Sequence, residues 1–270
     1  MNDLEFEKYE KAGHIAYVTI NRPEMMNALH PPASQELGRV WQDFNEDDES
    51  WVAIITGAGD RAFSAGMDLR YRAATQDWPP TERQPPDRGA NAGFGSLTNP
   101  RAAQIWKPII AAVNGYALGG GLELAMACDI IIAADTAQLG LPEPRRGIMA
   151  GAGGVHRLPR QIPLKIAMGY MLTGRHMSAQ EAHQWGLINE VVPAAELMAT
   201  AERWAREIME CAPLSVRATK QAAMMGLDKL SLDEAVNGTY PAQEQMSGSA
   251  DSREGPRAFA ERRKPVWTGR

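Results

Sequence analysis

The chain has 270 residues, of which 44% are hydrophobic and 23% are charged. These values are typical of a globular protein with one large domain or two smaller ones. A net charge of −5 at pH 7 argues against a general binding surface for nucleic acid or for an anionic membrane.

Neither membrane insertion nor secretion is predicted. No apolar run reaches the roughly 18 residues of a membrane-spanning helix, and the charged N-terminus has no apolar signal segment. The two cysteines, Cys128 and Cys211, are far apart, which favours two buried thiols in a reducing compartment over a disulfide framework. We therefore expect a cytoplasmic protein.

The first part of the chain alternates strand-like and helix-like segments. Residues 14–20 are rich in β-branched and aromatic side chains and are predicted to form a strand. Residues 34–47 place apolar residues at helical spacing, with Ser34 as a candidate N-cap. Three later segments are near-continuous apolar runs, as in strands buried on both faces; they are residues 51–57, 108–115 and 129–135. Strands that alternate with helices predict a mainly parallel sheet.

The segment 73–100 interrupts this pattern with prolines, glycines and mixed charge. A loop of this length is usually functional or mobile. It is either a surface insertion without a role or a lid or pocket wall, with Trp78 and Phe94 as candidate apolar contacts.

From Gly154 onward the chain is predicted to be mostly helical, with one short strand at 186–192. Its C-terminal helices hold many apolar residues at positions expected to be exposed, more than one helical layer needs, among them Leu197, Trp204, Ile208, Met224 and Met225. This surplus predicts assembly with further copies of the chain.

Two glycine-containing elements indicate chemistry. The triple glycine 119–121 directly precedes an apolar helix-like run, with Glu123 just inside that run and Glu143 farther along. A bare helix start offers backbone N–H groups to an anion, and two carboxylates at one reacting group can divide acid and base work. The second element, AFSAGMDLR at 62–70, makes a tight turn after a predicted strand, at the sheet edge where ligands bind.

These motifs together resemble the crotonase family, the enoyl-CoA hydratase/isomerase superfamily. The resemblance rests on AFSAGMDL, KPIIAAVNGYALGGGLELAMACDIIIA, LGLPEPRRGIMAGAGG, NRPEMMNAL at 21–29, LTGRHMSAQEAHQWGLINEVVP at 172–193 and EGPRAFAERRKP at 254–265. It implies an α/β fold, a crotonase-like spiral of β-β-α turns with a C-terminal helical trimerisation region. Residues 1–195 would form the spiral core with the CoA site and active site. Residues 196–270 would form the helical oligomerisation region of a homotrimer or a hexamer built as a dimer of trimers.

The resemblance also implies roles for individual residues. The backbone N–H groups of Met67 and Gly120 would hold the thioester oxygen, and Glu123 and Glu143 would be the catalytic carboxylates. The Ala65 carbonyl would contact the adenine of coenzyme A. The full set of implied substrate-binding residues is Met25, Met26, Ala65, Gly66, Asp68, Leu69, Arg70, Gly119, Arg262 and Lys264. Met25 and Met26 would lie near the ribose and pantetheine, and the basic C-terminal pair would approach the phosphates, often from a neighbouring subunit.

The implied activity is hydration of a 2-enoyl-CoA thioester without a metal or redox cofactor. Glu123 would activate water for attack at C3, and Glu143 would supply the proton at C2. Other crotonase reactions, such as carnitinyl-CoA dehydration or double-bond isomerisation, remain alternatives, as does a non-catalytic acyl-CoA-binding or RNA-binding relative. Three departures from the family pattern, Met67, Pro144 and Ala150, lie near the acyl pocket and leave the substrate open.

Overall fold

The computed structural model describes residues 3–75 and 104–270. Most of the predicted lid segment, including Trp78 and Phe94, lies outside these ranges. None of the helices in the described ranges has the length and apolar character needed to cross a membrane.

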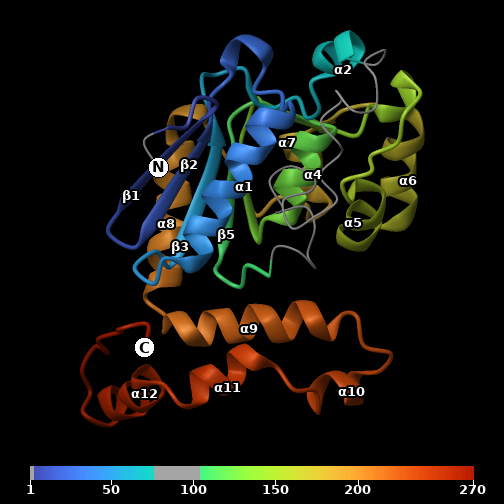
Figure 1. Ribbon diagram of the computed structural model, residues 1–270. Helices are drawn as coiled ribbons and strands as arrows, with labels where there is room; N and C mark the ends of the chain where they lie inside the picture. The colour runs from blue at the N-terminus through green and yellow to red at the C-terminus, as the bar shows by residue number, and fades with distance from the viewer. Residues whose placement is uncertain (1–2, 76–103) are drawn as a thin grey trace.

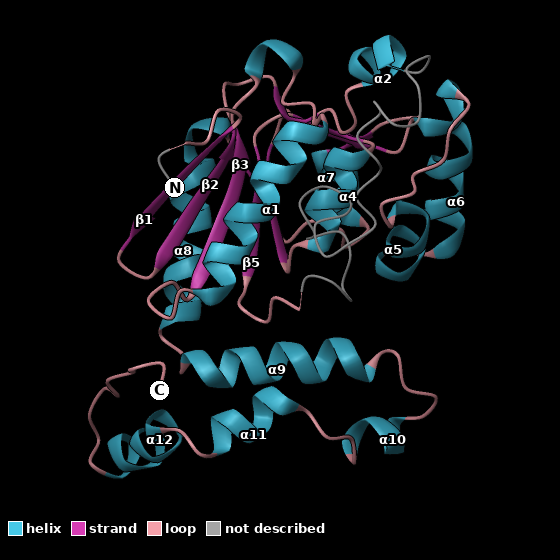
Figure 2. Cartoon of the chain, viewed as in Figure 1, coloured by secondary structure: helices cyan, strands magenta, loops and turns pink. Residues whose placement is uncertain are grey.

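A six-stranded sheet forms the centre of the fold, in the order β1-β2-β3-β5-β7-β10. Figure 2 shows β1, β2, β3 and β5 of this sheet. The strands are β1 (Glu7–Ala12), β2 (Ile15–Ile20), β3 (Val52–Gly57), β5 (Ile109–Val113), β7 (Ile130–Ala134) and β10 (Glu190–Val192). All neighbours are parallel except β1 and β2. The strands predicted at 14–20, 51–57, 108–115, 129–135 and 186–192 are confirmed with shorter bounds. Strand β1 was not predicted because its charged sequence suits a half-exposed edge strand.

A second, four-stranded sheet follows the order β4-β6-β8-β9. Its strands are β4 (Ala62–Ser64), β6 (Tyr116–Leu118), β8 (Gln138–Gly140) and β9 (Met177–Ser178). Strands this short give no periodic signal, so the sequence did not predict them. The chain passes from the large sheet to the small one and then into a helix, first through β3, β4 and α2 (Leu69–Thr75), then through β5, β6 and α4 (Gly120–Ala127). This order confirms the predicted spiral of β-β-α turns.

Helices cover both faces of the large sheet (Figure 1). On one face, α1 (Pro31–Glu46) buries Leu37, Val40, Trp41 and Phe44 in a core cluster that also contains residues of β2, β3 and β5. On the other face, α8 (Leu197–Met209) packs its apolar side on β3, β5 and β7. Helix α1 begins at Pro31 rather than after Ser34, because proline is well suited to the first helical position, where its missing N–H costs nothing.

Three predicted helices follow β8, with β9 between the second and the third. They are α5 (Gly154–Gln161), α6 (Leu164–Thr173) and α7 (Ala179–Gln184). Ser178 and Glu181 form a reciprocal capping box at the start of α7.

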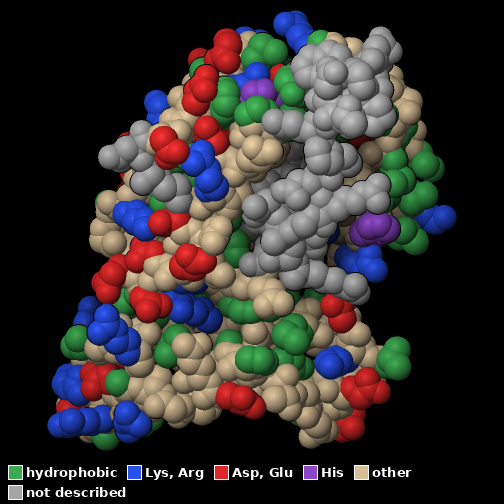
Figure 3. All heavy atoms as spheres, in the orientation of Figure 1, with side chains coloured by type: hydrophobic (Ala, Val, Ile, Leu, Met, Phe, Trp, Pro, Cys, Tyr) green, Lys and Arg blue, Asp and Glu red, His purple; other side chains and the backbone are tan. Residues whose placement is uncertain are grey.

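The last four helices form a layer apart from the sheets (Figure 1). They are α9 (Pro213–Gly226), α10 (Leu232–Val236), α11 (Pro241–Ser247) and α12 (Ala250–Ala260). Lys220 of α9 ties this layer to the core, because its Nζ lies 2.7 Å from Asp129 Oδ2 and 2.9 Å from the Lys107 carbonyl. Hydrophobic side chains are visible on this layer in Figure 3, and Met224, Leu227, Leu230 and Leu232 are exposed.

The apolar surplus predicted for the C-terminal helices is therefore only partly a free surface. Leu197 is 3% exposed and packs on the sheet, with Trp204 and Ile208 beside the same cluster. The expectation for Leu197 was wrong because the apolar side of an amphipathic helix here faces the sheet. Helix α8 thus packs with the core, whereas the boundary at residue 195 and the trimer remain predictions.

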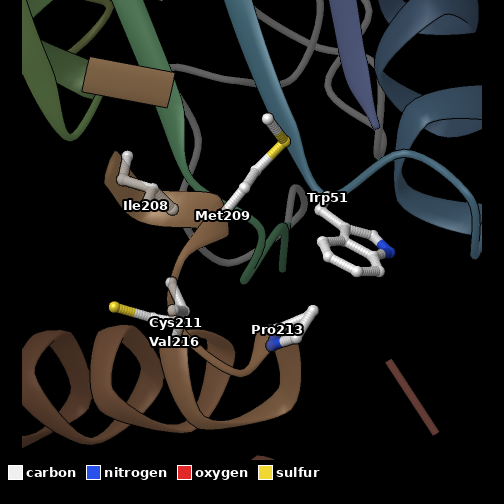
Figure 4. Close-up of a pocket in the computed structure, with 6 residues that line it drawn as sticks. All are labelled: Trp51, Ile208, Met209, Cys211, Pro213 and Val216. Atoms are coloured by element: carbon white, nitrogen blue, oxygen red, sulfur yellow. The ribbon is translucent and has the colours of Figure 1, made fainter. Parts of the chain in front are cut away.

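The two cysteines have different environments. Cys128 is a buried free thiol, as predicted, but Cys211 is exposed. It lies in the turn between α8 and α9, where it lines a small pocket with Trp51, Ile208, Met209, Pro213 and Val216 (Figure 4). Burial of Cys211 was wrongly predicted, because this residue lies in a turn between two helices and not inside a packed strand or helix.

Lys107 gives a test of core packing. Its side chain is 2% exposed, and Nζ donates hydrogen bonds of 2.6 Å to the carbonyls of Phe44 and Asp47 at the end of α1. Burial lowers the pKa of this ammonium group to about 8.

Lys107→Met leaves two carbonyls without their donor, so we expect a loss of about 1–3 kcal/mol in the free energy of unfolding. Urea denaturation measures it, with the exposed Lys8→Met as control; equal midpoints for Lys107→Met and wild type would contradict this role.

Candidate active site

Two backbone segments meet without side chains between them. Gly66, in the loop after β4, has φ of +79°, and a Cβ built on it would lie 2.5 Å from the Gly120 nitrogen. A Cβ on Gly121 would lie 2.0 Å from the carbonyl oxygen of Ser64. Glycine at these positions therefore allows the start of α4 to pack directly on the loop that contains Met67.

The amides of Met67 and Gly120 have no acceptor among the described residues. On either side of Met67, the Gly66 carbonyl accepts from Leu29 N–H at 2.7 Å and Asp68 N–H donates to the Leu29 carbonyl at 3.0 Å. Gly120 is the first residue of α4, where a helix leaves its N–H groups unused and its dipole favours negative charge. The geometry thus offers two neighbouring donors to one oxyanion.

Glu123 lies in the first turn of α4 and is 2% exposed. Its Oε1 accepts a hydrogen bond of 2.8 Å from Gly154 N–H, at the start of α5. Burial raises the pKa of Glu123, while the Gly154 and Ala152 backbone groups and the charge of Arg157 oppose that rise. The carboxylate is therefore held in place by a fixed donor.

Glu143 directly follows the Leu141-Pro142 link after β8 and opens the short 3₁₀ helix η2 (Glu143–Arg146). It is 8% exposed, and its Oε2 has no hydrogen-bond partner among the described residues. Burial, with a smaller contribution from the Glu123 charge, raises the pKa of Glu143 to about 7. A Cβ on Gly119 would lie 2.9 Å from Glu143 Oε1, so the triple glycine also makes room for this carboxylate.

The structure therefore brings four predicted residues together: Met67, Gly120, Glu123 and Glu143. Two amides can stabilise negative charge on an oxygen, while the two carboxylates have different partners and different proton affinities. Such a site can form an enolate and move protons at the adjacent carbons.

Part of the predicted coenzyme A contact set also converges. Met25 ends the 3₁₀ helix η1 (Pro23–Met25), and Met26 follows with a left-handed φ of 55°. Ala65 N–H donates to the Met26 carbonyl at 2.9 Å, which joins the methionine segment to the loop after β4. Directly after that loop, Leu69 and Arg70 are exposed at the start of α2.

Asp68 is engaged by the protein itself. Its side chain is 4% exposed, forms an ion pair with Arg22 at 3.2 Å, and accepts from the Arg70 and Tyr71 amides at 3.1 and 3.0 Å. Both carboxylate oxygens of Asp68 therefore have partners within the protein.

Arg262 and Lys264 do not reach this site within one chain. They follow α12, at the opposite end of the molecule from α2 (Figure 1), where basic side chains are visible in Figure 3. That these two side chains approach the phosphates of a coenzyme A bound to a neighbouring subunit remains a prediction.

Arg22 and Asn27 support the site, although the sequence did not identify them. Asn27 is fully buried, and its Nδ2 donates to the carbonyls of Ala58 and Ala62 at 2.9 and 2.7 Å. Both residues belong to the NRPEMMNAL motif at 21–29, and that motif was the only feature of the sequence that could have identified them.

Within 3–75 and 104–270, no group of three or more His, Cys, Asp or Glu side chains could hold a metal ion.

Comparisons with known proteins agree with this geometry. A family model described as enoyl-CoA hydratase/isomerase matches residues 10–270. The (E)-benzylidenesuccinyl-CoA hydratase of Thauera aromatica is 41% identical over 260 residues, which cover 96% of this chain and 98% of that protein. The carnitinyl-CoA dehydratase of Escherichia coli K12 is 42% identical over 263 residues, which cover 96% of each chain. The crystal structure of enoyl-CoA hydratase from Mycobacterium tuberculosis H37Rv matches with a TM-score of 0.88 at 38% identity, over 98% of this chain and 99% of that one. The chain belongs to the enoyl-CoA hydratase/isomerase family and has the crotonase fold.

Gly66→Ala tests the direct packing of the two amide-bearing segments. The new Cβ would separate Met67 from Gly120, so we expect turnover of a CoA-thioester substrate to fall about 10²–10³-fold, as for loss of one oxyanion donor. Gly13→Ala is a matched control, because Gly13 also has a left-handed φ, of +58°, but a Cβ there meets nothing within 4 Å. Both variants require a check of folding by circular dichroism. A folded Gly66→Ala variant as active as Gly13→Ala would contradict the packing argument.

Proposed function

We propose that this crotonase-family protein is a hydro-lyase that adds water across the 2,3 double bond of a 2-enoyl-CoA thioester. The observation that supports this most is the pair of buried glutamates at the triple glycine, beside two amides that have no acceptor among the described residues. No metal or redox cofactor is needed for this chemistry, and coenzyme A is part of the substrate.

In the proposed reaction, the Met67 and Gly120 amides bind the thioester oxygen. Glu123 takes a proton from water as the water oxygen bonds to C3, and the electron pair of the double bond moves toward the thioester oxygen as enolate charge. Glu143 then donates its proton to C2, which returns the thioester and yields a 3-hydroxyacyl-CoA. Because the amides are fixed in advance, they stabilise charge that exists only after water attacks.

The environments of the two glutamates support the assignment of Glu123 as the base and Glu143 as the acid. The pKa of Glu143 near 7 keeps part of the population protonated at neutral pH, as an acid requires. Glu123 receives a hydrogen bond from Gly154 N–H, which favours its charged form and hence its action as a base.

A second candidate is dehydration of a 3-hydroxyacyl-CoA with a functional group on its acyl chain. The two curated relatives are named for a benzylidenesuccinyl-CoA and a carnitinyl-CoA, and both names describe addition or removal of water. Dehydration uses the same residues in reverse. Double-bond isomerisation gives no reason for two buried carboxylates at one site, and binding without catalysis gives no reason for them either.

Glutamine substitutions test the two-carboxylate mechanism. Glutamine keeps the size of glutamate but cannot exchange a proton at neutral pH. We expect Glu123→Gln and Glu143→Gln each to lower crotonyl-CoA hydration by about 10²–10⁴-fold, with little change in thioester affinity. Loss of the conjugated enone absorbance measures the rate.

Glu10→Gln is the control, because Glu10 is exposed on β1. It should retain wild-type turnover. Full hydration by Glu123→Gln would refute the two-glutamate hydratase and favour an isomerase.

The raised pKa of Glu143 also predicts a dependence of stability on pH. The folded protein binds this proton up to a pH of about 7, against an ordinary glutamate value of 4.5, so ionisation destabilises the fold as pH rises through this window. Glutamine has no such cost. We expect Glu143→Gln to gain stability over wild type between about pH 5 and about pH 8, by up to roughly 3 kcal/mol.

Urea unfolding at both pH values measures this difference, with Glu10→Gln on the surface of β1 as control. A difference between Glu143→Gln and wild type that does not grow with pH would show that Glu143 is not a buried acid.

A further inference from the structure

The Met67 amide lies in a loop that needs an external support. Residues 65–68 connect β4 to α2, and their regular partners are three backbone hydrogen bonds with residues 26–29: Ala65 N to Met26 O, Leu29 N to Gly66 O and Asp68 N to Leu29 O, at 2.7–3.0 Å. These bonds leave the Met67 N–H directed away from that segment. The direction of this donor therefore depends on the position of residues 26–29.

Residues 26–29 are themselves irregular. Met26 and Asn27 have left-handed φ values of 55° and 53°, which side chains other than glycine rarely adopt. Such a conformation persists only where surrounding contacts determine it. Asn27 provides part of these contacts. Its side-chain Nδ2 donates to the carbonyls of Ala58 and Ala62, and its backbone carbonyl accepts from Ser64 Oγ at 2.8 Å.

Arg22 connects both sides of this arrangement. Its Nη1 donates to the Ala28 carbonyl, and both Nη atoms lie 3.2 Å from Asp68 Oδ2. The other oxygen of Asp68 holds the first amides of α2, from Arg70 and Tyr71. One guanidinium thus links the segment before Leu29 to the residue directly after Met67.

This ion pair is nearly removed from solvent, with side-chain exposures of 12% for Arg22 and 4% for Asp68. A buried ion pair adds little net stability compared with apolar packing, because both charges lose their hydration. Its orienting effect is larger, since Arg presents a planar fork of donors at fixed angles.

We propose that Arg22 and Asp68 are a positioning pair that directs the Met67 backbone N–H toward the thioester oxygen. The inference rests on the proposed function, and it gives Asp68 a role in aligning the site instead of contacting substrate. Neither side chain touches the reacting atoms.

The test separates orientation from stability. Arg22→Met leaves Asp68 as an unpaired buried charge and should destabilise the fold, whereas Arg22→Met with Asp68→Asn removes both charges. We expect this folded double variant to lose about 10²-fold in kcat for crotonyl-CoA, in line with loss of one oxyanion donor, with KM changed much less. Arg22→Lys keeps the charge without the fork and should recover stability more than kcat.

A spectroscopic probe reports the oxyanion donors directly. Para-dimethylaminocinnamoyl-CoA is a chromophoric 2-enoyl thioester whose absorption moves to longer wavelength when its carbonyl oxygen is polarised. We expect a red shift on binding to wild type and to Glu143→Gln, and loss of most of that shift in the bound double variant. Arg206→Met, which breaks an exposed ion pair on α8, is the control and should keep the shift.

The outcomes distinguish failure of the positioning role of Arg22 and Asp68 from failure of the proposed hydratase function. A folded double variant with wild-type kcat and a full red shift would overturn the positioning role while leaving the hydratase proposal intact. A wild-type protein that neither hydrates 2-enoyl thioesters nor shifts the probe would overturn the proposed function, and the positioning role with it.

Discussion

The active site depends on one steric constraint, the direct packing of backbone against backbone where the loop after β4 meets the start of α4. No side chain fits at Gly66 or Gly121, because any Cβ would lie 2.0–2.6 Å from main-chain atoms of the other segment. This contact sets Met67 beside Gly120, and neither amide has an acceptor within residues 3–75 and 104–270. The third glycine, Gly119, extends the same bare surface to Glu143.

Burial of the two carboxylates follows from that arrangement and has a cost. Burial raises the pKa of Glu143 to about 7, so this group retains its proton near neutral pH, while Glu123 receives the Gly154 amide. The fold would be more stable without an ionised group in this place. An acid that must give up its proton near neutral pH requires such an environment. The destabilising feature and the proposed catalytic one are thus the same group.

The supports of the site come from segments distant in sequence. Arg22, at the end of β2, is tied to Asp68 after β4, and Asn27 reaches the carbonyls of Ala58 and Ala62. The family motif at 21–29 and the glycine motif at 62–70 each suggested a ligand contact. Their mutual contact could not be predicted, because a sequence shows which polar residues are present but not which of them become each other's partners. The same limit hid Lys107, whose ammonium caps the end of α1.

The sequence alone determined the apolar strands, the amphipathic helices and the order of the family motifs, since these depend on local periodicity and on glycine at fixed places. It also resembles the crotonase family in its motifs, and that resemblance, not the periodicity, implied the crotonase fold and the four central site residues, Met67, Gly120, Glu123 and Glu143. It did not predict β1 or the small sheet, whose strands are charged or only two to three residues long. It also misplaced Leu197 and Cys211, because burial depends on what covers a residue. Only the tertiary structure decided those environments and the proton affinity of Glu143, because both arise from groups that folding brings together from separate parts of the chain.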